Sequence, residues 1–173
     1  MTLRPAAIVA VLAVPIAAMA EEQLAFVPPP GFVIMAQTGA DGAFVREYRF
    51  PDDPGEPWRA RQVHQRLPDW AGANPIEFLR LRAGELQADC PEIAFRVTNG
   101  RVPGGYPNAA IFGRCPSEPQ EWFVSVAVSG DAALHVAEHV WQGTPAPEVF
   151  EQRLAAMMAT PLCQAARAPG PCP

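Results

Sequence analysis

The residues of this chain that could do chemistry are gathered in one short run, His135-Val136-Ala137-Glu138-His139. Imidazole nitrogens are common zinc ligands, and two histidines four residues apart are neighbours on one face of a helix. A carboxylate beside such a metal can accept a proton from the bound water. If the run is helical, His135 and His139 could therefore hold zinc, with Glu138 as the general base.

This H-x-x-E-H pattern resembles the signature of the inverzincin metallopeptidases, and the similarity continues through the next five residues. The resemblance implies a zinc hydrolase with His135 and His139 as ligands, Glu138 as base, and a further glutamate ligand well downstream. Only Glu148 and Glu151 follow, and the chain ends 34 residues after His139. That leaves no room for the rest of such a domain.

The alternative conformation for this run is a strand. Gly130-Asp131 predicts a tight turn leading into residues 132–142. In a strand, His135 and His139 lie about 13 Å apart and cannot share a metal. We then expect both on the solvent face of an edge or outer strand, with no metal and no cofactor, and we expect His64 at the surface too.

Other functional signatures are missing from the sequence. All 13 basic residues are arginine, which excludes a catalytic or phosphate-binding lysine. The arginines are scattered and the net charge is −5, which argues against a nucleic-acid partner. The tryptophans could line a ligand groove, but we expect packing in or beside the core for each of them: Trp58, Trp70, Trp122 and Trp141.

The first twenty residues have the three-part layout of a secretory signal peptide. Arg4 gives a positive start, residues 6–18 are almost wholly apolar, and Ala18-Met19-Ala20 is a small-x-small cleavage site. The apolar run is too short to span a bilayer. We therefore expect a periplasmic or secreted protein whose mature chain begins at Glu21 and has no membrane span.

The mature part contains four cysteines: Cys90, Cys115, Cys163 and Cys172. An even number in an exported chain indicates two disulfides, and four cysteines allow three pairings. We favour Cys90–Cys115 and Cys163–Cys172. Zinc binding is the alternative, but the sequence has no C-x-x-C pair and no tight Cys/His cluster.

The remaining pattern predicts one α+β domain over residues 21–160 and a proline-rich, disulfide-tied tail over 161–173. Asn74 and Pro75 are a good N-cap and first helical residue, and Thr144-Pro145 is the predicted start of a second helix. Asn99-Gly100 is a strong hairpin signal, and Gly104-Gly105 predicts a turn or bulge. Alternation of apolar residues predicts an antiparallel sheet of about six to seven strands with the two helices packed on it, the strands covering residues 31–38, 43–50, 58–67, 93–98, 106–115, 122–129 and 132–142.

This element order, with Pro28-Pro29-Pro30-Gly31-Phe32 leading into the first strand, resembles the Mog1/PsbP-like sandwiches. The resemblance implies a binding or assembly role rather than catalysis. We therefore expect a small exported binding or accessory protein, without catalytic activity, whose partner is an unknown protein or small ligand. Two alternatives stay open: an envelope inhibitor or immunity-type protein, favoured by small size, acidity and disulfides, and a zinc-binding hydrolase that uses His135, Glu138 and His139.

Overall fold

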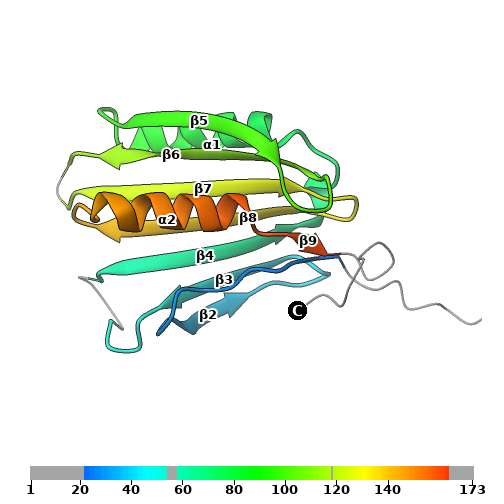
Figure 1. Ribbon diagram of the computed structural model, residues 1–173, viewed down its shortest axis with the longest axis horizontal. Helices are drawn as coiled ribbons and strands as arrows, with labels where there is room; N and C mark the ends of the chain where they lie inside the picture. The colour runs from blue at the N-terminus through cyan, green and yellow to red at the C-terminus, as the bar shows by residue number, and fades with distance from the viewer. Residues whose placement is uncertain (1–21, 54–57, 118, 164–173) are drawn as a thin grey trace, which may run out of the picture.

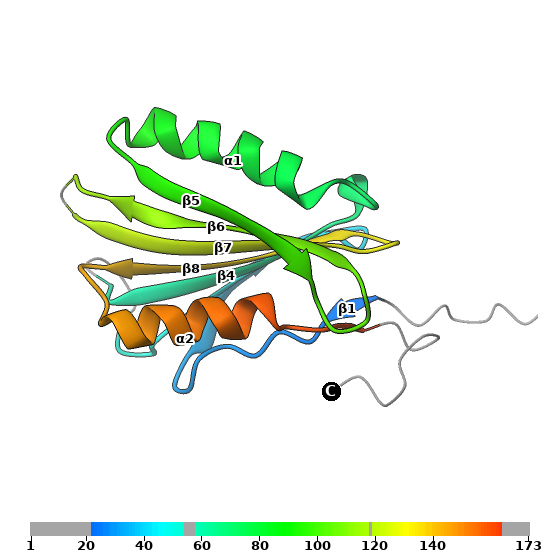
Figure 2. The same cartoon turned by 45° about the horizontal axis from the view of Figure 1, so that its top comes forward.

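The computed structural model describes residues 22–53, 58–117 and 119–163. Seven of its strands pair into one antiparallel sheet, and a helix lies on each face of that sheet (Figures 1 and 2). The seven strands lie in the order β2-β3-β4-β8-β7-β6-β5. The predicted α+β class is confirmed. The signal peptide predicted for residues 1–20 lies outside the described residues, and none of the described helices is long and apolar enough to cross a membrane.

The elements have the following bounds in chain order: β1 (Gln23–Leu24), β2 (Val33–Thr38), β3 (Phe44–Arg49), β4 (Ala60–Leu67), the 3-10 turn η1 (Pro68–Trp70), α1 (Pro75–Asp89), β5 (Ala94–Arg101), β6 (Pro107–Cys115), β7 (Glu121–Ser129), β8 (Leu134–Gln142), α2 (Pro147–Met158) and β9 (Leu162–Cys163).

Helix α1 begins where the sequence predicts and covers one face of the sheet (Figure 2). Asn74 Oδ1 accepts a hydrogen bond from the Ile76 amide at 3.0 Å, which satisfies one of the free N–H groups of the first turn. Leu79 is fully buried against the sheet. The predicted Cys90–Cys115 disulfide is confirmed and joins the end of α1 to the end of β6.

Helix α2 covers the other face, with Met157 buried and Phe150 and Leu154 packed beside it. It begins at Pro147, later than the predicted start at Thr144-Pro145. Ala146 precedes a proline and is extended, with ψ of 140°, because the proline ring clashes with a helical conformation at the residue before it. The helix therefore begins one proline later than expected.

The chain before β2 crosses the same face as α2. Residues 25–32, which we call the strap, follow β1 and run over β3 and β4 beside α2 (Figures 1 and 2). β1 pairs with β9, so Leu162–Cys163 is held against Gln23–Leu24. Cys172 lies outside the described residues, so its pairing with Cys163 stays a prediction.

Two turn predictions need correction. Asn99-Gly100 is not a turn: β5 continues through both residues, which pair with Ala109 and Asn108. The chain reverses instead at Gly104-Gly105, so the turn predicted at that position is confirmed. Both residues have positive φ, a conformation that glycine adopts readily. The turn predicted at Gly130-Asp131 is present but longer than expected, because four residues rather than two connect β7 to β8.

Candidate functional site

The H-x-x-E-H run lies on β8, so the strand prediction is correct and the helical one is wrong. The predicted environment is nevertheless wrong. β8 is a central strand between β4 and β7, and His135 and His139 are only 1% and 3% exposed. The strap and α2 cover the face to which these histidines belong. Neither is on a solvent face or an edge strand.

The sheet separates Glu138 from the two histidines. Alternation along a strand puts Glu138 on the opposite face, where it is buried. Burial raises the pKa of its carboxyl group, and the guanidinium groups of Arg82 and Arg61 partly oppose that rise. Among the described residues no three His, Cys, Asp or Glu side chains are placed to hold a metal. The zinc arrangement of His135, Glu138 and His139 is therefore not assembled.

The third histidine joins the same face from β4. His64 is 4% exposed rather than at the surface, and its ring centroid lies 5.9 Å from that of His135. The rings of Phe26 and Phe44 pack against it at 4.9 and 5.0 Å. Burial is the main cause that lowers the pKa of His64 to about 3, with His135 and Arg46 adding to it. At neutral pH this ring is uncharged.

One end of this face holds Glu22, the first residue that the structure describes. Glu22 is 2% exposed, its Oε1 lies 3.5 Å from His135 Nε2, and its Oε2 accepts a hydrogen bond from the Asp131 amide at 2.8 Å. Gly130 makes room for the carboxylate, because a Cβ there would lie 1.9 Å from Glu22 Oε1. A polar pocket of about 400 Å³ lies beside this contact and includes His64 and His135 in its lining. We assign Glu22 and His135 to fixing the start of the strap.

At the other end of the face lies His139. Its Nδ1 is 3.4 Å from Gln62 Oε1, and its ring is 4.2 Å from Trp141 and 5.7 Å from Phe32 of the strap. Burial, with Arg153 nearby, lowers the pKa of His139 to about 3. This histidine is thus a neutral ring within an aromatic group.

That aromatic group forms the floor of a groove between α2 and the strap. The groove holds a pocket of about 520 Å³. A smaller pocket of about 240 Å³ adjoins it, shares Arg153 and Ala156 with it, and reaches Gln62. We call the two together the α2 groove; its larger pocket is lined by Pro29, Pro30, Phe32, Phe50, Arg59, Ala60, His139, Trp141, Val149, Gln152, Arg153 and Ala156.

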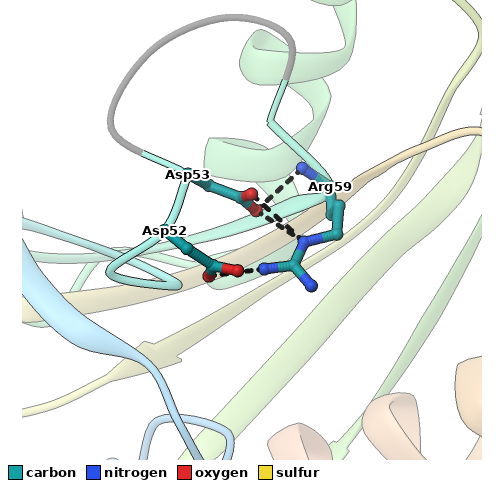
Figure 3. Close-up of polar contacts among 3 residues, drawn as sticks. All are labelled: Asp52, Asp53 and Arg59. Carbon is teal, nitrogen blue, oxygen red and sulfur yellow. Dashed lines mark hydrogen bonds and ion pairs between the residues drawn. The ribbon is translucent and has the colours of Figure 1, made fainter.

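The two arginines of the groove differ in their partners. Arg59 is held by two aspartates, with Nε 3.1 Å from Asp53 Oδ2 and Nη2 2.6 Å from Asp52 Oδ1 (Figure 3). Its guanidinium also lies over the ring of Phe50 at 4.4 Å. Arg153 is half-buried, burial lowers its pKa, and it forms no ion pair with any acid in the described part of the chain.

From the sequence, packing in or beside the core is the expectation for each tryptophan, and a ligand groove is the alternative. Trp141 was one of the four tryptophans considered for a ligand groove, and it lines this one, whereas Trp58 is buried in the core against α1. Arg153 was missed. It lies three residues after Phe150 and four before Met157, on the inward side of α2, and a charge within an apolar stripe was the signal available in the sequence.

Comparison with known proteins adds no relative, since no family model and no curated protein sequence matches this chain.

Proposed function

We propose that this chain is an exported, non-catalytic binding protein whose ligand is a small, largely apolar molecule held in the α2 groove. The observation that carries the proposal is the groove itself. Small-molecule sites in proteins are concave, mostly apolar, and about 300–1,000 Å³ in volume, with a few polar groups that fix orientation. The pocket of about 520 Å³ between α2 and the strap has that size and that lining.

The half-buried aromatic rings supply the main contact surface. Phe32 comes from the strap, Phe50 directly follows β3, and Trp141 lies on β8, so they converge on the groove from separate segments. Aromatic side chains provide large apolar contact area with few rotatable bonds. The rings are already held by neighbours, Phe32 against Phe50 at 4.5 Å and Trp141 against His139, so little ordering accompanies binding.

The protonation state of His139 favours binding over catalysis in this groove. A general acid or base works best with a pKa near the working pH. The pKa of His139, which lines the groove, is lowered to about 3, and Glu138 is on the far face of the sheet. The groove therefore offers contact surface and charge, and no group poised for proton transfer at neutral pH.

The test uses the neutral fluorescent probe N-phenyl-1-naphthylamine and two tryptophan substitutions on α2. Both Ala155 and Ala156 are exposed, but Ala156 lines both pockets of the groove and Ala155 lines neither. We expect saturable binding at one site per chain, at least tenfold weaker in Ala156→Trp and unchanged in Ala155→Trp. The absence of saturable binding, or equal binding by both variants, would overturn the proposal.

A further inference from the structure

We infer that the ligand of the α2 groove is an amphiphile with one oxyanion head, a carboxylate or a phosphate, bound to Arg153, and an apolar body on the aromatic floor. This inference rests on the proposed function and names the chemical class of its ligand.

The head group is assigned by the environment of Arg153. Its side chain is half-buried at the junction of the two pockets, beside Ala156 and Met157, and it has no acidic ion-pair partner among the described residues. A cation removed from water without a counter-ion is unfavourable. An oxyanion relieves this cost, because the planar guanidinium can donate two parallel hydrogen bonds to a carboxylate or phosphate.

The other titratable groups of the groove leave this charge uncompensated. Arg59 is already neutralised by Asp52 and Asp53, as Figure 3 shows. His139 carries no charge at neutral pH, since its pKa is lowered to about 3. Arg153 is thus the one arginine of the groove lining without an acidic partner among the described residues, and its single charge is complementary to a singly charged head.

The apolar body is assigned by the rest of the lining. Besides Arg153, the larger pocket is lined by Trp141, Phe50 and the prolines of the strap, and the smaller one by Met157. An unbranched chain of about ten carbons is small enough for a pocket of this class. Decanoate, decyl phosphate and decanol therefore share one body and differ only in the head.

The experiment measures the dissociation constant of each of the three compounds by displacement of N-phenyl-1-naphthylamine. The variants are Arg153→Gln, Arg153→Lys and the charge-matched control Arg80→Gln, whose side chain is exposed on α1, on the other face of the sheet. We expect the wild type and Arg80→Gln to bind one or both anions at least tenfold more tightly than decanol. Arg153→Gln should bind all three alike, and Arg153→Lys should fall between because it keeps the charge without the planar fork.

The outcomes separate this inference from the proposed function. If decanol binds as tightly as both anions, or if Arg153→Gln keeps the preference for an anion, the inference is overturned while the groove remains a binding site. If none of the three compounds and no probe binds, the proposed function fails and the inference fails with it. A preference for decanoate alone or decyl phosphate alone supports the inference and identifies the head.

Discussion

At the scale of single residues, the chain places all three of its histidines in the interior of one sheet face. The pKa of an exposed histidine is about 6.5. Below that pH, a histidine that stays neutral in the folded protein takes up a proton when the chain unfolds. The pKa values of His64 and His139 are both lowered to about 3. Acid therefore favours the unfolded chain through these two groups. Glu138 acts in the opposite direction, because its raised pKa makes the folded state bind a proton more readily.

The histidine contribution can be isolated with His64→Phe, since His64 already lies between Phe26 and Phe44. Between pH 6 and 5 the free energy of unfolding should fall more steeply in the wild type than in the variant, by up to about 1.4 kcal/mol per pH unit. Urea unfolding at several pH values gives both slopes. Equal slopes would mean that His64 titrates normally in the folded protein.

At the scale of elements, the strap matters because it forms one wall of the α2 groove, and Glu22 fixes its start. Gly130→Ala would place a Cβ 1.9 Å from Glu22 Oε1 and push the carboxylate away from the Asp131 amide. We expect a loss of about 1–3 kcal/mol in the free energy of unfolding, measured by urea unfolding. In a Glu22→Ala background the same change should cost much less, because the clash is gone. Additive costs would contradict the contact.

The elements also show how far the sequence could lead. Cap residues such as Asn74 and the alternation along each strand act locally, so the helices, most strands and the Cys90–Cys115 pairing were predictable. The order of the strands was not, because β8 is buried on both faces although it carries two histidines and a glutamate, and a lone strand does not reveal its neighbours. The strap has no periodicity at all. Its position over β4, which buries the histidines and forms the groove, depends on long-range contacts such as Phe32 with His139.

At the scale of the whole molecule, the two faces of the sheet have different contents. The face under α1 holds an apolar core around Leu79 and Trp58. The face under α2 and the strap holds the histidines, three pockets with charged residues in their lining, and the half-buried Arg153. Under the proposed function, binding belongs to the α2 side, and the α1 side, with its Cys90–Cys115 disulfide, is the supporting layer.

The most direct test of the groove as the binding site is a ¹H–¹⁵N NMR titration of the chain from Glu21 onward with decanoate. The tryptophan indoles report on different places: Trp141 lies in the groove, Trp58 lies in the core under α1, and Trp70 packs against Phe78 of α1. We predict that the Trp141 indole and the Arg153 Nε–H resonances shift together and saturate, while those of Trp58 and Trp70 stay in place. Unchanged Trp141 and Arg153 resonances at saturating decanoate would contradict the account.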